Sequence, residues 1–166
     1  MEQVIEQFKE RILVAAANKQ PLRIRGGGTK DWYGQTPVGE LLDTRAYSGV
    51  VAYDPTELVI TVRAGTPLAE VEAILAEQNQ MLAFEPPHFG PGATVGGMVA
   101  SGLSGPGRAA VGATRDFVLG VVLMDGKGES LHFGGQVMKN VAGYDVSRML
   151  AGSLGTLGLF CLLYTS

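Results

Sequence analysis

The sequence has little of several residue types, and each shortage excludes a class of protein. The single cysteine, Cys161, cannot form an intrachain disulfide, which fits a reducing compartment. One cysteine, two histidines and no H-E-x-x-H pattern argue against a metal site. The net charge is -3 and no lysine- or arginine-rich run occurs, so we expect no nucleic-acid partner.

Long hydrophobic runs are also missing. No stretch of 18 uncharged apolar residues occurs, so we expect no transmembrane segment. Residues 1–10 lack the basic and continuous apolar regions of a signal peptide. The sequence therefore predicts a cytoplasmic protein, and docking to the inner face of a membrane through partner subunits stays open. With 46% apolar and 17% charged residues, the chain is expected to fold rather than to be disordered.

Glycine, in contrast, is abundant. It accounts for 24 of the 166 residues, roughly twice its usual share of about 7%. The glycines cluster in residues 26–28, 90–107 and 152–158. Such clusters indicate backbone in unusual conformations, or backbone that another group approaches closely, although any one cluster is equally explained by tight turns.

Hydrophobic periodicity predicts an α+β protein. One amphipathic helix begins near Val4 and ends near Asn18, and a second begins with Thr66 as its N-cap and Pro67 in its first turn. Strands are predicted at residues 22–25, 50–53, 58–62, 118–124 and 130–133, the last two forming a hairpin. We expect a small β-α-β lobe over residues 1–82 and a larger, mainly antiparallel lobe over residues 83–166.

Three segments are candidates for ligand binding. In residues 25–30, a strand leads into Gly26-Gly27-Gly28, where successive N–H groups can form an anion nest, helped by Thr29 and by Arg25 or Lys30. Phosphate binding is favoured there over a plain turn, although neither a P-loop nor a Rossmann fingerprint is present. Residues 86–105 contain almost no large side chain after Phe89, which suits a wall for a flat ligand or a mobile surface loop. The third segment is residues 139–145 followed by residues 152–158, and residues 155–160 suit a strand that allows close backbone approach.

The order and spacing of these motifs carry a family resemblance. They read R-G-G-G-T at 25–29, G-A-T-V-G-G at 92–97, R-D-x-V-L-G at 115–120, K-N-x-A-G-Y-D at 139–145 and G-S-x-G-T-L-G at 152–158. Together they resemble the FAD-binding domain of the vanillyl-alcohol oxidase / p-cresol methylhydroxylase (PCMH-type) superfamily. Within it the chain is similar to the FAD-binding E subunits of bacterial glycolate oxidases.

The resemblance implies a fold, a cofactor and a set of binding residues. The fold would be the two-lobed PCMH-type domain, and the cofactor FAD would be bound without a covalent link, because Thr29 stands where some relatives carry a linking histidine. The pyrophosphate would lie at Arg25 to Thr29. The full set implied to contact FAD is Arg25, Gly26, Gly27, Gly28, Thr29, Gly92, Thr94, Val95, Gly96, Gly97, Ala100, Ser101, Ser104, Gly105, Gly152, Gly155, Thr156, Gly158 and Leu159.

The resemblance also implies an activity and partners. The protein would be an oxidoreductase subunit acting on glycolate or another 2-hydroxyacid, beside a second FAD subunit and an iron–sulfur subunit. A noncatalytic assembly subunit and a different flavoenzyme on the same fold are the alternatives. No catalytic residue is assigned, since flavin carries the chemistry. His88 is expected to be structural rather than functional, and Arg115-Asp116 either orients the cofactor or forms a buried ion pair.

The C-terminal residues depart from the family pattern. After Gly158 the relatives continue along an alternating strand into a substrate domain, whereas residues 160–166 here break that alternation. We therefore expect a C-terminally truncated chain whose last five or six residues are foreign to the native protein. An interrupted strand would leave the second lobe without its remaining pairing partners.

Overall fold

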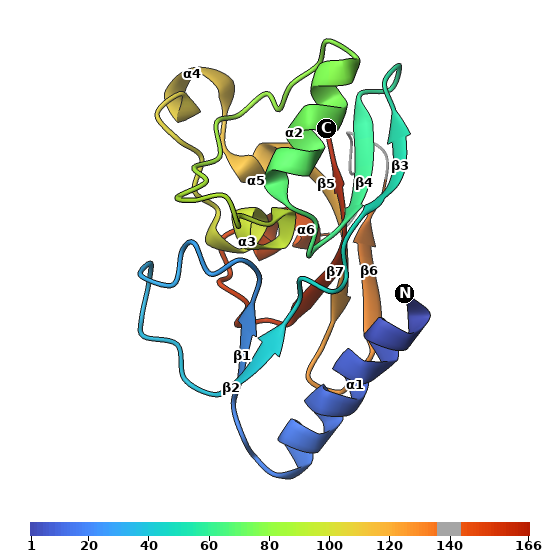
Figure 1. Ribbon diagram of the computed structural model, residues 1–166, viewed down its shortest axis with the longest axis vertical. Helices are drawn as coiled ribbons and strands as arrows, with labels where there is room; N and C mark the ends of the chain where they lie inside the picture. Colours follow the sequence, from blue (N-terminus) through green and yellow to red (C-terminus); the bar gives the residue numbers. More distant parts are fainter. Residues whose placement is uncertain (136–143) are drawn as a thin grey trace.

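The strands form two sheets of unequal size in the computed structural model, which describes residues 1–135 and 144–166 (Figure 1). The small sheet pairs β1 (Leu22–Arg25) in parallel with β2 (Glu40–Asp43). Each neighbouring pair in the larger sheet is antiparallel, and its order is β3 (Val50–Asp54), β4 (Val59–Arg63), β7 (Leu159–Thr165), β5 (Val118–Met124) and β6 (Ser130–Gly134). The expected α+β class and the β5–β6 hairpin are confirmed.

Strand β7 lies at the centre of the larger sheet. Arg63 of β4 pairs with Leu162 on one side, and Val121 of β5 pairs with Leu163 on the other. The expectation that the strand is interrupted after Gly158 is therefore wrong. The physical reason is burial on both faces, because a doubly covered strand reads as a continuous apolar run instead of an alternating one.

Helices cover the two faces of this sheet. Phe8 and Ile12 of α1 (Glu2–Ala17) pack against one face, where Val122 and Met124 of β5 point. The opposite face carries the main core, to which the apolar sides of α2 (Leu68–Glu77), α3 (Val95–Ser101) and α6 (Val146–Leu150) contribute. Two short helices, α4 (Arg108–Val111) and α5 (Thr114–Phe117), precede β5.

The start of α2 differs from the expectation. Pro67, and not Thr66, occupies the N-cap position. The Thr66 hydroxyl donates instead to the Arg63 carbonyl at 2.6 Å and accepts from the Gly49 amide at 2.9 Å. Because Thr66 is fully buried, these backbone groups are the partners within its reach, and the side chain ties the helix to the β3–β4 hairpin. The apolar face predicted for this helix is buried as expected.

The larger sheet extends across the predicted lobe boundary. Strands β3 and β4 precede residue 82, whereas β5, β6 and β7 follow it, and all five share one sheet. The division at residue 82 stays a prediction about domain organisation. Among the residues that the structure describes, no helix combines the length and the apolarity that a membrane crossing requires.

Cys161 provides a test of the position of β7. Its side chain is buried on that strand, and burial raises the pKa of the thiol to about 11. Because the thiolate is the reactive form, we expect a thiol reagent at pH 8 to label the native protein far more slowly than the protein unfolded in guanidinium. Equally fast labelling in both states would contradict a central β7.

Candidate functional site

The first two glycine-rich segments lie against one another. A Cβ atom built on Gly27 would overlap the carbonyl oxygen of Gly92, and one built on Gly26 would overlap the hydroxyl of Thr94. A side chain at either position therefore requires the two segments to separate. The structure thus brings loop 25–30 and segment 92–97 into direct contact, as a shared binding site requires.

The third segment joins this pair through α3. The Gly152 amide donates to the Val99 carbonyl at 2.9 Å, and the Leu154 amide donates to the Ala100 carbonyl at 2.9 Å. A Cβ atom on Gly102 would lie 2.9 Å from the Cα atom of Gly152. Backbone contacts without intervening side chains therefore hold segment 152–154 to the C-terminal half of α3.

Four cavities follow the junction of these segments, and neighbouring cavities share lining residues. Their volumes are about 670, 120, 70 and 190 Å³. The 120 Å³ cavity lies against loop 25–30, and the 670 Å³ cavity adjoins it at Ser101. The predicted site residues that line at least one of the four are Arg25, Gly26, Gly27, Gly28, Thr29, Thr94, Gly96, Gly97, Ala100, Ser101, Ser104, Gly105, Gly152, Gly155, Thr156, Gly158 and Leu159.

The two remaining predicted site residues line none of these four cavities. Gly92 is exposed and contacts loop 25–30 through the close approach of Gly27. Val95 is 1% exposed and belongs to the hydrophobic core beneath α3. Val95 thus supports the binding surface from behind, and the contact of either residue with FAD stays a prediction.

Loop 25–30 has the groups that an anion needs. In the described part of the chain, the amides of Gly27, Gly28 and Thr29 donate no hydrogen bond to protein atoms. Lys30 is partly buried beside them, and this burial lowers the pKa of its ammonium group. Its Nζ atom donates to the His88 carbonyl at 3.4 Å. Free amides and a desolvated ammonium fit a phosphate group, since an anion satisfies both.

Asp31 takes up part of the positive charge at this loop. Its Oδ2 atom accepts from the Arg23 guanidinium at 2.6 Å and from Arg25 Nε at 2.8 Å. The Arg25 guanidinium lies so close to Gly28 that any Cβ atom there would overlap it. Arg25 is therefore held against the loop by Asp31, which leaves Lys30 as the cation with no carboxylate partner among the described loop residues.

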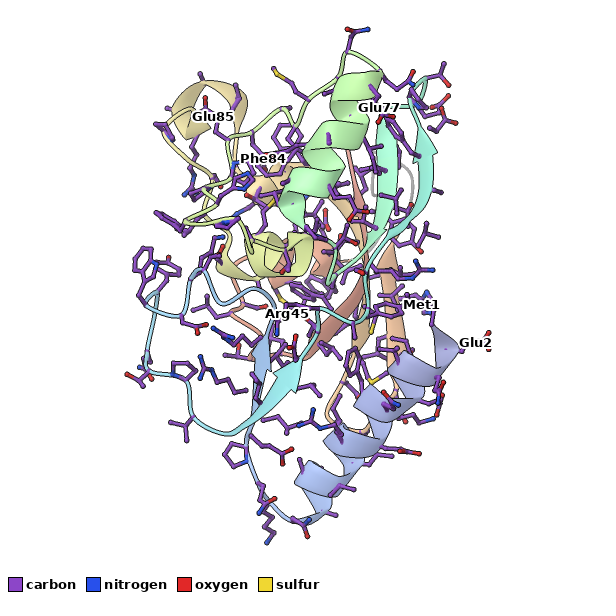
Figure 2. All side chains as sticks on the ribbon, in the orientation of Figure 1. Met1, Glu2, Arg45, Glu77, Phe84 and Glu85 are labelled. Atoms are coloured by element: carbon purple, nitrogen blue, oxygen red, sulfur yellow. The ribbon has the colours of Figure 1, made fainter. Side chains whose placement is uncertain are left out.

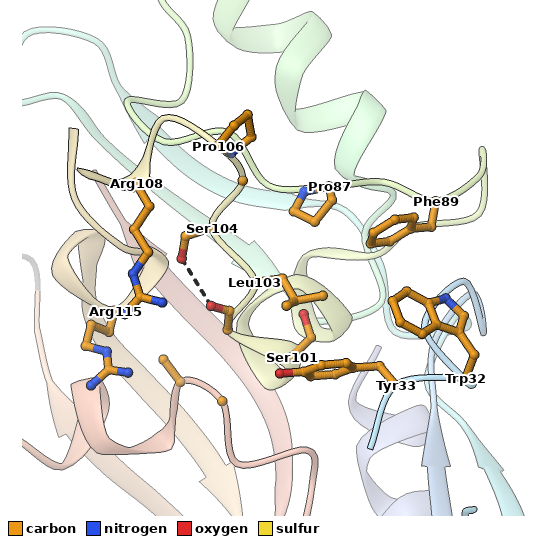
Figure 3. A pocket seen from close by; sticks show the side chains of 14 residues that line it. Trp32, Tyr33, Pro87, Phe89, Ser101, Leu103, Ser104, Pro106, Arg108 and Arg115 are labelled. Atoms are coloured by element: carbon orange, nitrogen blue, oxygen red, sulfur yellow. Dashed lines mark hydrogen bonds between the residues drawn. The ribbon is translucent and has the colours of Figure 1, made fainter. Parts of the chain in front are cut away.

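The 670 Å³ cavity has two chemically different ends (Figure 3). Trp32, Tyr33 and Phe89 lie at one end, where the Trp32 and Phe89 rings meet edge to face with centroids 5.1 Å apart. Arg108 and Arg115 lie at the other. The aromatic end suits a flat, partly apolar group, and the arginine end suits an anion.

Sequence reasoning missed the aromatic residues and Arg108. The signal that was available is the pair Trp32-Tyr33, which follows the glycine-rich loop directly. Two adjacent aromatic residues next to a candidate anion-binding loop indicate a ligand-binding surface, because exposed apolar patches often mark such sites. Phe89 lies far from this pair in the sequence, so only the fold brings it into contact with Trp32.

Side-chain contacts hold the chain just before and within residues 86–105, the segment for which a mobile surface loop was the alternative. Phe84 is buried and stacks on Phe117 with ring centroids 5.2 Å apart, beside α2 in Figure 2. Further along, His88 Nε2 lies 3.0 Å from Glu72 Oε1 of α2. His88 thus has a partner within the fold, and its structural role stays a prediction.

The expected buried ion pair between Arg115 and Asp116 is not what the structure has. Both side chains are exposed, and Asp116 Oδ2 accepts from the Ala113 amide at 2.8 Å. Asp116 is the third residue of α5, and from this position a carboxylate can accept from the free amide at the helix start. It makes this hydrogen bond instead of an ion pair with Arg115. Residues 139–143 of the predicted K-N-x-A-G-Y-D motif lie outside the described residues.

The family comparison decides what this arrangement belongs to. Residues 3–134 match the family model described as FAD binding domain. The chain belongs to the FAD-binding domain family. The predicted FAD cofactor is confirmed at this level, and loop 25–30 with its free amides is the part of the chain suited to the phosphates of FAD.

Individual relatives agree with this assignment. The chain is 54% identical over 150 residues, 90% of its length, to glycolate oxidase subunit GlcE of Escherichia coli, of which it covers 43%. It is 29% identical over 157 residues to glycolate oxidase subunit GlcD of Bacillus subtilis, and the match covers 93% of this chain and 33% of that protein. It is 34% identical over 142 residues to D-lactate dehydrogenase of Archaeoglobus fulgidus, and the match covers 84% of this chain and 31% of that protein. The chain thus spans less than half the length of these relatives.

A solved structure confirms the fold. An alkyldihydroxyacetonephosphate synthase superposes with a TM-score of 0.76 over 96% of this chain and 29% of its own, at 22% sequence identity. The two-sheet arrangement of the chain is accordingly the PCMH-type FAD-binding fold that the sequence motifs indicated.

The contact between Gly27 and Gly92 yields a matched pair of variants. A methyl group on Gly27 overlaps the Gly92 carbonyl, whereas one on Gly92 meets Gly27 at ordinary contact distances of 3.5 and 3.6 Å. We expect Gly27→Ala to lower the free energy of unfolding by about 1–3 kcal/mol and to weaken FAD binding. Gly92→Ala should stay within about 0.5 kcal/mol of the parent. Denaturant melts and FAD titration measure both, and equal behaviour of the variants would contradict this loop geometry.

Proposed function

We propose that the chain is the FAD-binding part of a subunit of a glycolate, or 2-hydroxyacid, oxidising complex. The observation that carries this proposal is the 54% identity to glycolate oxidase subunit GlcE across 90% of the chain. The names of the GlcE and GlcD relatives indicate a complex of several subunits. We propose that this chain acts in the cytoplasm beside a second FAD subunit and an iron–sulfur subunit.

We propose that FAD lies along the connected cavities, held between the two predicted lobes. The first lobe, residues 1–82, contributes loop 25–30 for the pyrophosphate. The second lobe, residues 83–166, contributes segments 92–105 and 152–159 for the flavin and the remainder of the cofactor. The continuity of the cavities supports this placement, and so do the backbone amides of Gly27 to Thr29 that are free of protein acceptors.

When bound, FAD would supply the redox chemistry by taking two electrons from the hydroxyl-bearing carbon of the substrate. The residues of this chain would bind and orient. The amides of loop 25–30 and the Lys30 ammonium would offset the phosphate charges. The small side chains at Gly96, Gly97 and Ala100 would allow a flat ligand to lie close to the backbone.

One observation favours the alternative of a noncatalytic assembly subunit. The described residues that line the 670 Å³ cavity include no aspartate, glutamate, histidine or lysine. This part of the chain therefore supplies no carboxylate or imidazole as a general base there, although the hydroxyl proton of a 2-hydroxyacid must go to some acceptor. In this alternative the flavin-type fold serves assembly of the complex, and the homologous subunit oxidises the substrate.

Anaerobic addition of glycolate to the purified full-length subunit, alone and in its complex, separates these functions. We expect the subunit to contain FAD and glycolate to bleach its flavin absorbance in the complex. FAD that stays oxidised in this subunit while the partner flavin is bleached would support the assembly role. A full-length subunit that contains no FAD would contradict the oxidising function and leave the assembly role of the fold.

The mode of attachment is tested separately. Thr29 has no imidazole nitrogen with which to form a flavin link, so we expect the FAD to be noncovalent. Acid precipitation of the full-length subunit should leave yellow flavin in the supernatant. Flavin that stays in the washed protein pellet would show that another side chain makes the bond.

A further inference from the structure

The arginine end of the large cavity is not needed for the cofactor phosphates. Arg108 of α4 and Arg115 of α5 line the cavity of about 670 Å³. Loop 25–30, which we propose holds the pyrophosphate, lines a different cavity of about 120 Å³ and has its own cations in Arg25 and Lys30. The two guanidinium groups are thus additional positive charge at a second position.

Neither guanidinium is neutralised by a carboxylate of this chain. The ion pairs of the described residues involve Arg11, Arg23, Arg25, Arg45, His88 and Arg148 as the basic partners. Residues 136–143, which the structure does not describe, contain no aspartate or glutamate in their sequence. Arg108 and Arg115 therefore present two positive charges toward the cavity that an external anion can satisfy.

Two carboxylates hold backbone amides beside these helices. Glu85 Oε2 accepts from the Gly107 amide at 2.8 Å, just before α4. Asp116 Oδ2 accepts from the Ala113 amide at 2.8 Å, just before α5. These two bonds fix the ends of segment 107–113, and neither carboxylate forms an ion pair with Arg108 or Arg115.

A buried polar cluster fixes the position from which Arg115 extends. Thr114 is fully buried, its amide donates to Ser104 Oγ at 3.0 Å, and its hydroxyl donates to the Leu103 carbonyl at 3.2 Å. Ser104 Oγ in turn donates to the Gly102 carbonyl at 3.1 Å, the bond drawn dashed in Figure 3. The start of α5 is thereby fixed to the cavity wall, which reduces the ordering that ligand binding requires.

We infer that Arg108 and Arg115 bind the carboxylate of a small organic acid at this end of the cavity. This inference rests on the proposed function, which makes that acid a 2-hydroxyacid. The planar guanidinium group presents paired N–H donors that match the two oxygens of a carboxylate. The opposite end of the cavity is lined by aromatic residues, so the paired cations for a carboxylate lie only at the arginine end.

The test is binding of oxalate to the FAD-loaded full-length protein by isothermal titration calorimetry. Oxalate has the carboxylate but no C–H bond to oxidise, so binding is measured without turnover. We expect Arg108→Gln and Arg115→Gln each to raise the dissociation constant of oxalate at least tenfold, about 1.4 kcal/mol. Arg115→Lys should give an intermediate value, because lysine keeps the charge and loses the paired donors.

Lys127→Gln is the matched control. Lys127 is exposed in the β5–β6 turn and lines none of the four cavities, so the variant removes the same charge elsewhere. It should bind oxalate as the parent does. Because Arg108 and Arg115 are both exposed, their variants should melt at the parent temperature, and loss of oxalate binding in a folded variant supports the inference.

Three results would overturn the inference. They are absence of oxalate binding in the parent, unchanged oxalate binding in both arginine variants, and a loss of FAD affinity as large as the loss of oxalate affinity. The last would mean that the arginines hold the cofactor phosphates. Bleaching of the parent flavin by glycolate tests the proposed function independently, so either can fail while the other stands.

Discussion

The candidate site depends on the way backbone packs directly against backbone around α3. The amide of Gly96 donates to the Ala64 carbonyl at 2.8 Å, which fixes the start of the helix to the end of β4. Its C-terminal half accepts the amides of Gly152 and Leu154. Because a Cβ atom on Gly96 would lie 2.8 Å from the Ala64 carbonyl oxygen, this spacing exists only with glycine there. One seven-residue helix thereby joins the end of β4 to segment 152–154.

The distribution of charge at the site follows from a competition among side chains. Asp31 binds two arginines beside loop 25–30 and so removes much of their charge from any ligand. Lys30, in contrast, is desolvated and has a lowered pKa. A bound phosphate would compensate the desolvation of the Lys30 ammonium, which makes ligand binding and the protonation of Lys30 mutually favourable.

Much of the fold and of the site could be predicted, because their signals are local. The amphipathic pattern of residues 4–13 specifies α1, and the β-branched runs around Asp125-Gly126 specify the β5–β6 hairpin. The glycine motifs could be assigned to a ligand because their order and spacing together resemble a cofactor-binding family, whereas any one cluster alone fits a tight turn. Most of the predicted residues do line the cavities, although their contact with FAD stays a prediction.

The misread features depend on contacts distant in sequence. Thr66 precedes Pro67 in a pattern that predicts an N-cap, yet its hydroxyl bonds to Gly49 and Arg63 at the β3–β4 hairpin. The run after Gly158 lacks alternation because both faces of β7 are covered, by α1 on one side and by the main core on the other. Phe89 joins Trp32 only through the folded loop. None of these three features can be predicted from neighbouring residues, because each depends on a segment that packs against it and is distant in the sequence.

The central place of β7 has a consequence for biosynthesis. On the ribosome, the β3–β4 hairpin is synthesised long before β7, the strand that pairs with β4. Strand β5 is also synthesised before β7, which is its second neighbour in the sheet. Until residues 159–165 leave the exit tunnel, the nascent chain has two partial sheets with open edges and no continuous core. The third glycine-rich segment emerges just ahead of β7, so sheet closure and completion of the cofactor cleft would occur almost together. Newly made chains would thus become able to recruit flavin only at the moment when their aggregation-prone edges are covered.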